Sequence, residues 1–123
     1  RVMEFATLIA ARHWTQQYEW HSHHERAMKA GLKPAIADAI AEGRRPSGMA
    51  EDEDIVYDLL TENLHNKSVS DSTYARAVAQ FGERGVVDLV ALAGYYSTLA
   101  MVMNMARTAL PAGKLQLLKP FPH

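Results

Sequence analysis

A histidine-rich stretch in the first quarter of the chain carries the residue types that general acid–base chemistry needs. The run Trp20-His21-Ser22-His23-His24-Glu25 contains three of the six histidines. On a helix, Glu19 and His23 stand four residues apart, so their side chains meet on one face. A carboxylate beside an imidazole orients the ring and raises its pKa toward working pH. We expect Glu19 and His23 to form an acid–base pair, the alternative being an exposed ion pair that adds only a few tenths of a kcal/mol.

The same stretch allows a metal-binding alternative. His21 with His24, or His21 with Glu25, would supply two ligands from one helix face. A third ligand would have to come from another part of the chain, with these candidates: His13, His65 and Glu4. No spacing singles one of them out, so the main prediction contains no metal and no cofactor. A metal-dependent enzyme or a metal-binding oligomer built on the His21/His23/His24 cluster remains the alternative.

Isolated polar residues in apolar segments are further candidates. Glu4 stands between Met3 and Phe5, and such a carboxylate either faces water or is buried with a partner. Tyr96 and Asn104 interrupt the apolar C-terminal segment, where a buried hydroxyl or amide needs a hydrogen-bond partner. We therefore treat Tyr96 and Asn104 as candidate hydrogen-bond donors to a substrate.

The elements that must position these residues are all helices. Apolar residues recur at helical spacing, and no alternating run of β-branched residues indicates a strand. Thr15 is expected as an N-cap and Gly82 as a helix break. An extended or loose tail is expected from Lys114 to His123. About six helices are predicted, over residues 2–13, 15–30, 33–43, 51–66, 71–81 and 83–110.

Composition narrows the class of protein. The 123 residues fit one domain, and a net charge of −1 gives no reason to expect nucleic acid or an anionic membrane as a partner. The absence of cysteine excludes disulfide scaffolds and thiol catalysis. The chain begins at Arg1 without a targeting pattern. We expect some N-terminal residues to be missing and the protein to be cytoplasmic.

The residues quoted above resemble the carboxymuconolactone decarboxylase family, which includes the AhpD alkylhydroperoxidases. The resemblance is carried by Arg1-x-x-Glu4-Phe5-x-x-Leu8, Tyr18-Glu19-Trp20-x-x-His23 and Ala27-x-x-Ala30-Gly31-Leu32. It resumes at Gly94-Tyr95-Tyr96 and continues to Asn104. It implies a single AhpD-like helical domain over residues 1–123 that assembles as a homotrimer or homohexamer, with the active site near a subunit boundary.

The chain departs from both branches of that family. The peroxidase branch has a C-x-x-C pair before its histidine, and alignment on His23 places Gln16 and Glu19 at the two cysteine positions. Thiol peroxidase activity is not expected, since the attacking group must be a thiolate. The decarboxylase branch has a glutamate four residues before its histidine, as Glu19 precedes His23. It lacks a glutamate at the position of Glu4 and a long loop like that over 43–50.

The resemblance implies a cofactor-free, decarboxylase-like lyase that acts on a small carboxylated lactone or oxo-acid. His23 is expected to donate the proton, Glu19 to orient it, and Glu4 to act as a second relay group. Loss of carbon dioxide leaves an enolate-like carbanion, so the site must stabilise charge and protonate carbon. A non-catalytic helical oligomerisation module is a further alternative. Substrate contacts are expected from Tyr96, Asn104, His24 and Trp20.

Overall fold

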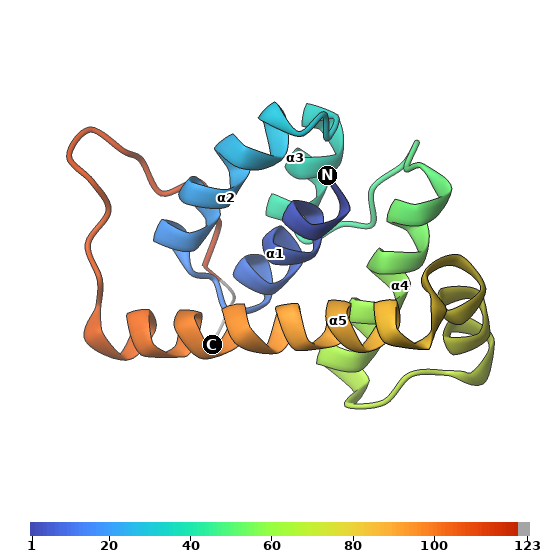
Figure 1. Ribbon diagram of the computed structural model, residues 1–123. Coiled ribbons are helices and arrows are strands. Elements are labelled where there is room, and N and C mark those ends of the chain that lie inside the picture. Colours follow the sequence, from blue (N-terminus) through green and yellow to red (C-terminus); the bar gives the residue numbers. More distant parts are fainter. Residues whose placement is uncertain (121–123) are drawn as a thin grey trace.

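Helix α1 (Val2–His13) lies at the centre of the domain, and the other helices pack around it (Figure 1). All eight residues from Phe5 to Arg12 are buried, so this helix has almost no solvent-facing side over that length. A helix that is buried all round needs neighbours on every side. It contacts α2 (Gln17–Lys29), α3 (Pro34–Ala41), α4 (Glu51–Asn66) and α5 (Asp71–Ala106).

The computed structural model describes residues 1–120, which form an all-helical domain. The predicted all-α class is confirmed. The described residues contain five helices, fewer than the six expected, because the last two join into the single element α5. The predicted break at Gly82 is present as a kink inside α5. At this residue φ is 74° and ψ is 166°, which is not helical.

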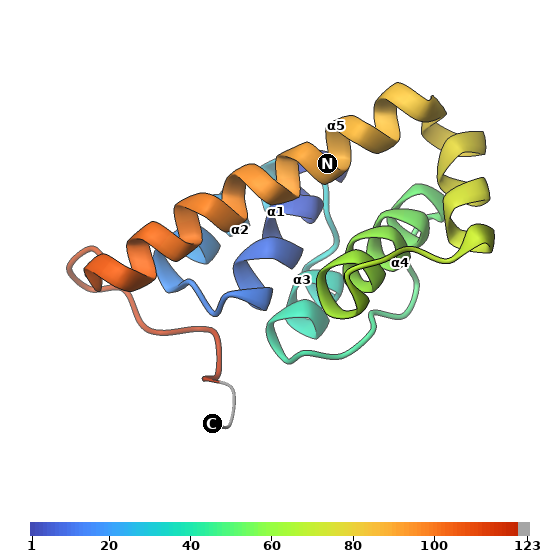
Figure 2. The ribbon, with the colours of Figure 1, turned by 90° about the horizontal axis from the view of Figure 1, so that it is seen from below.

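Beyond the kink at Gly82, helix α5 runs straight along one side of the molecule, whereas its first part turns away from that direction (Figure 2). Ser70 caps its start by accepting a hydrogen bond from the Thr73 amide. One side of the helix beyond Gly82 is buried against the domain. The buried side chains of that segment are Val86, Leu89, Ala93 and Ala100. The opposite side is exposed, which leaves a long helix covered on one face only.

Two predicted helix ends differ from the structure. Thr15 does not cap α2, because its φ of 50° places it in the left-handed region. The cap is Gln16, whose side-chain oxygen accepts hydrogen bonds from the amides of Tyr18 and Glu19. The last helix ends at Ala106, since Arg107 turns into the left-handed conformation with φ 54°.

The tail after α5 returns along α2. Gln17 and the backbone of Leu118 exchange two hydrogen bonds, of 2.7 and 3.0 Å, and Leu118 is buried. The Arg12 guanidinium donates to the Lys119 carbonyl over 2.7 Å. The expected extended tail therefore packs on the domain as far as residue 120, while the part of that expectation on residues 121–123 lies outside the described residues.

The backbone conformation at the kink predicts that adding a side chain at Gly82 lowers the stability of the fold. The combination of positive φ and extended ψ is open almost exclusively to glycine. Gly82→Ala is expected to lower the free energy of unfolding by about 1 to 3 kcal/mol, measured by urea denaturation. Gln80→Ala, at an exposed helical position two residues away, is the matched control and should change stability little. Equal effects of the two substitutions would contradict the expected strain.

Candidate functional site

His23 of α2 is hydrogen-bonded to a carboxylate of α1. Its Nδ1 lies 2.7 Å from Oε2 of Glu4, and the His23 side chain is almost fully buried. An ionised carboxylate only accepts hydrogen bonds, so Nδ1 carries the proton and Nε2 is the ring atom left for chemistry. The carboxylate that orients His23 is therefore Glu4, and not Glu19 as the spacing along the helix predicts.

Glu19 lies one helical turn before His23, and its carboxylate is buried. Its residue exposure is 2%, and neither carboxylate oxygen has a hydrogen-bond partner among residues 1–120. Burial raises the pKa of Glu19 from the ordinary 4.5 to about 7, because a charged carboxylate is poorly solvated there. Near neutral pH this group can both hold and release a proton, which is a requirement for a general acid or base.

Tyr96 of α5 contacts His23. Its ring packs edge-on against the His23 ring, with 4.7 Å between the ring centroids. Burial and the negative charge of Glu4 both raise the pKa of Tyr96, so its hydroxyl stays protonated. Tyr95 continues the contact outward, with its ring 5.1 Å from that of Tyr96. The structure thus brings together Glu4, Glu19, His23 and Tyr96 from three helices.

Asn104 holds α5 to the turn between α1 and α2. Its Oδ1 accepts a hydrogen bond from Gln16 over 3.0 Å, and its Nδ2 donates to the Trp14 carbonyl over 2.9 Å. Gln16 in turn caps the helix that carries Glu19 and His23. Both ends of the Asn104 side chain therefore bind the protein, which makes this residue a support for the site. Its predicted role as a substrate donor would fall to the second N–H of Nδ2, because the first donates to Trp14.

Trp20 and His24 line a cavity that lies apart from the His23 group. Their rings lie 5.9 Å apart, and both line a cavity of about 290 Å³ between α2, α3 and the tail. The other lining side chains are Asp38, Ala41, Glu42, Leu117 and Lys119. Glu4, Glu19, His23 and Tyr96 do not line this cavity. The structure thus separates the two predicted substrate contacts Trp20 and His24 from the Glu4–His23 pair.

The three histidines of α2 face different surroundings. The His21 ring contacts the Leu115 carbonyl, His23 binds Glu4, and His24 packs on Trp20. Within residues 1–120, no three histidine, aspartate or glutamate side chains converge in a way that would hold a metal ion. The metal-binding alternative therefore gains no support from the arrangement of these side chains.

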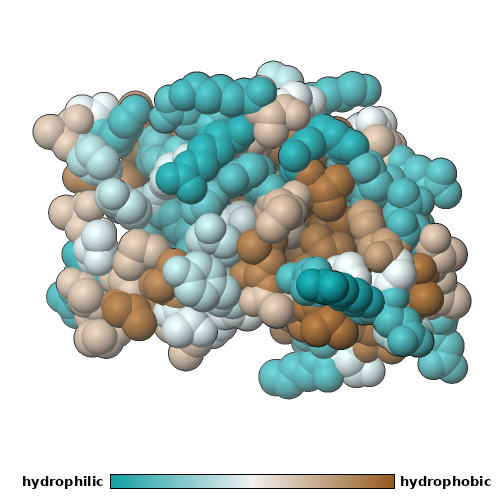
Figure 3. Space-filling model, viewed as in Figure 1, coloured by the Kyte–Doolittle hydropathy of each residue, from teal (hydrophilic) through white to brown (hydrophobic). Residues whose placement is uncertain are grey.

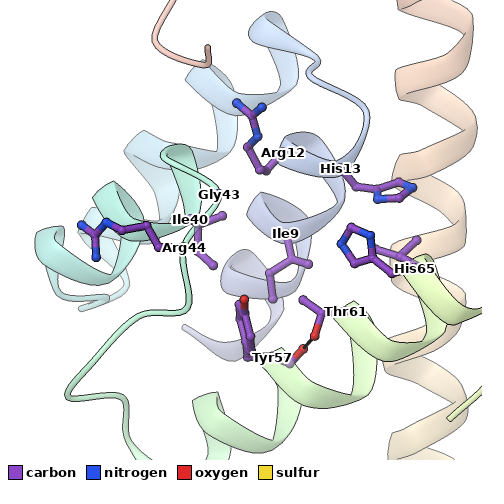
Figure 4. A pocket seen from close by; sticks show the side chains of 10 residues that line it. Ile9, Arg12, His13, Ile40, Gly43, Arg44, Tyr57, Thr61 and His65 are labelled. Atoms are coloured by element: carbon purple, nitrogen blue, oxygen red, sulfur yellow. Dashed lines mark hydrogen bonds between the residues drawn. The ribbon is translucent and has the colours of Figure 1, made fainter. Parts of the chain in front are cut away.

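A second group of titratable residues surrounds a cavity of about 110 Å³ (Figure 4). Figure 4 shows His13 and His65 on one side of this cavity and Arg44 on the other. The two imidazoles are 5.2 Å apart, and burial together with the charge of His65 lowers the pKa of His13. From the sequence, both histidines are predicted only as candidate third metal ligands. Their pairing was not visible there because they come from α1 and α4.

Comparison of the chain with protein-family models, curated proteins and solved structures finds no significant match. The resemblance to the carboxymuconolactone decarboxylase family therefore remains an expectation from the quoted residues. Function must be argued from the chemistry of the Glu4, Glu19, His23 and Tyr96 group.

The raised pKa of Glu19 predicts a pH-dependent stability. The folded protein holds this proton up to about pH 7, whereas the unfolded chain loses it near 4.5. The stabilisation is therefore fully present below pH 4.5 and is lost as pH rises through 7. Glu19→Gln removes the ionisation, so its stability relative to the wild type should rise by up to about 3 kcal/mol across this interval.

Chemical denaturation at a series of pH values measures this difference. The matched control is Glu25→Gln, because Glu25 is an exposed carboxylate on the same helix, paired with Lys29. No comparable rise is expected for the control. A Glu19→Gln curve parallel to that of the wild type at all pH values would show that Glu19 titrates normally.

Proposed function

We propose that this protein is a cofactor-free lyase that decarboxylates a small carboxylated lactone or oxo-acid by general acid–base catalysis. The observation that carries the proposal is Glu19, one helical turn before His23 of the Glu4–His23 pair. Its carboxylate is buried, has a pKa of about 7 and has no hydrogen-bond partner in the described part of the chain. A buried polar group with no partner is costly to keep for stability alone. Such groups with shifted pKa values are concentrated at functional sites.

Each residue of the group has a role that follows from its contacts. Glu4 accepts a hydrogen bond from Nδ1 and so orients the His23 ring, which leaves Nε2 as the atom that delivers the proton to carbon. Glu19 stands one helical turn before His23, and its uncharged form avoids repelling a carboxylate substrate. The Tyr96 hydroxyl, kept protonated, is a donor for the developing enolate oxygen.

The substrate class follows from the reaction. Loss of carbon dioxide requires an electron sink next to the breaking bond, which a lactone or oxo carbonyl provides. The electron pair of the broken C–C bond moves to that carbonyl as an enolate, and protonation at carbon completes the cycle. No electron leaves or enters, so no redox cofactor is required.

We also propose that the protein is a cytoplasmic homo-oligomer. The exposed apolar face of α5, where apolar side chains gather along the helix in Figure 3, supports the assembly of several copies.

The test is turnover of γ-carboxymuconolactone by the purified protein, followed by carbon dioxide release. His23→Ala should lower kcat by about 100-fold or more, since general acid–base catalysis contributes that much. His23→Gln serves as a second variant in case the alanine substitution disturbs folding, and circular dichroism checks both. Loss of activity is expected in each.

Glu25→Gln on the same helix is the control and should retain wild-type turnover, because its carboxylate is exposed and paired with Lys29. Glu4→Gln should leave measurable activity but lower kcat, because an amide does not fix the orientation and tautomer of the imidazole as a carboxylate does. A folded His23→Ala variant with full turnover would remove His23 from the mechanism. No carbon dioxide release by the wild type would overturn the proposed substrate.

A further inference from the structure

The cavity drawn in Figure 4 lies between α1, α4 and the end of α3. We call it the two-histidine cavity, after His13 and His65, which both line it. Its volume is about 110 Å³. Ile9 and Ile40 line it from the interior, each with 4% exposure, whereas His65 and Arg44 are exposed. The cavity therefore reaches from the apolar core to the surface, so a small molecule can enter it from solvent.

Helical spacing brings the polar groups of this cavity together. Ile9 and His13 stand one turn apart on α1. Tyr57, Thr61 and His65 stand on successive turns of one face of α4. His13 and His65 meet where the two helices pack, with 5.2 Å between their ring centroids. Neither imidazole makes a hydrogen bond within residues 1–120, so the ring nitrogens are available to a ligand.

A metal ion does not fit this pair of imidazoles. Zinc in proteins takes at least three protein ligands, and within residues 1–120 no third histidine, aspartate or glutamate joins the two rings. No carboxylate of the described residues lines the cavity, whose ionisable lining residues are Arg12, His13, Arg44, Tyr57 and His65. Groups that donate hydrogen bonds or carry positive charge thus surround the space, which favours an anion.

The two arginines act on this space only from a distance. The Arg12 guanidinium donates to the carbonyls of Ala41 and Lys119. Arg44 pairs with Glu42 over 2.5 Å. Figure 4 shows both guanidinium groups directed away from the cavity. Direct polar contacts with a ligand therefore fall to the two imidazoles.

The charge of the imidazole pair also favours a negative ligand. Burial, together with the charge of His65, lowers the pKa of His13. Two protonated rings at this distance repel each other, and a negative charge beside both rings would offset that repulsion. A neutral or cationic ligand offers no such compensation.

The rest of the lining determines the body of the ligand. Ile9, Ile40 and Leu64 are aliphatic, and the Tyr57 ring stands across from His65 (Figure 4). Such surroundings stabilise an alkyl group by removing it from water. Phosphate or sulfate would lose water there at several oxygens without gaining hydrogen-bond donors. Since a dry cavity of about 150 Å³ holds benzene, the smaller two-histidine cavity is suited to roughly five non-hydrogen atoms.

We propose that the two-histidine cavity binds a short aliphatic monocarboxylate of about the size of propionate. The carboxylate accepts hydrogen bonds from ring N–H groups of His13 and His65, and the alkyl end lies against Ile9 and Ile40. The site is separate from the candidate active site, because no member of the His23 group lines the cavity. The inference does not depend on the proposed activity.

An NMR titration of the isotope-labelled protein with sodium propionate tests the site, with sodium chloride at the same ionic strength as the reference. Saturable shifts are expected at the residues that line the cavity, with a Kd on the order of 1 mM for a ligand of this size. Propionamide has nearly the same shape without the charge. It should bind at least about tenfold more weakly, because charge-assisted hydrogen bonds are the stronger ones.

Two variants test the location. His65→Leu removes one donor from an exposed position and should weaken propionate binding at least about tenfold. Thr61→Phe should block the cavity while keeping both imidazoles, and circular dichroism checks that each variant folds. The matched control is His23→Gln, which removes an imidazole outside the cavity and should keep the wild-type affinity for propionate.

Four results would overturn the inference. The absence of saturable shifts in the wild type, at concentrations well above the expected Kd, would remove the site. Equal binding of propionamide would show that the charge is not recognised. Unchanged affinity in folded His65→Leu and Thr61→Phe would place the ligand elsewhere. Loss of binding in His23→Gln, with retention in His65→Leu, would place it at the candidate active site. None of these measurements uses turnover, so a failure of the proposed reaction remains a separate result.

Discussion

The burial of α1 on all sides is the constraint on which the rest of the structure depends. Eight consecutive residues, Phe5 to Arg12, are removed from water, and four other helices contact this one helix. Three of the eight are alanines, Ala6, Ala10 and Ala11, which let neighbouring backbones approach closely. Glu4 stands at the rim of this buried stretch, where a carboxylate keeps partial contact with water and still reaches the facing helix. The packing of α1 therefore also fixes one end of the candidate site.

The turn between α1 and α2 transmits that packing to His23. Gln16 caps α2 through two backbone amides and binds Asn104 of α5 with its other end. Asn104 also holds the Trp14 carbonyl. Three helices are thus joined within one turn, which sets the rotation of α2 about its axis. That rotation decides which side chains of α2 face Glu4 and Tyr96, so side chains without direct chemistry control the geometry of the site.

The site combines two carboxylates in opposite situations. Glu4 has a hydrogen-bonded partner and some contact with solvent, whereas Glu19 has neither. The surroundings of Glu19 also change its acid–base chemistry, because burial raises its pKa to about 7. Two carboxylates held in distinct environments around one imidazole provide both an orienting charge and an exchangeable proton.

The sequence by itself determined the helical class, the approximate helix ranges and the break at Gly82, because apolar periodicity and glycine act locally. It also drew attention to Glu4, Glu19, His23 and Tyr96. Only the tertiary structure decided that Glu4, rather than Glu19, binds His23, since a spacing of four residues permits a contact along one helix but cannot reveal a competing residue on another. It likewise decided that Asn104 supports a turn and that Trp20 and His24 line a separate cavity. These outcomes depend on the angle and rotation at which helices pack, and residues distant in the chain set both.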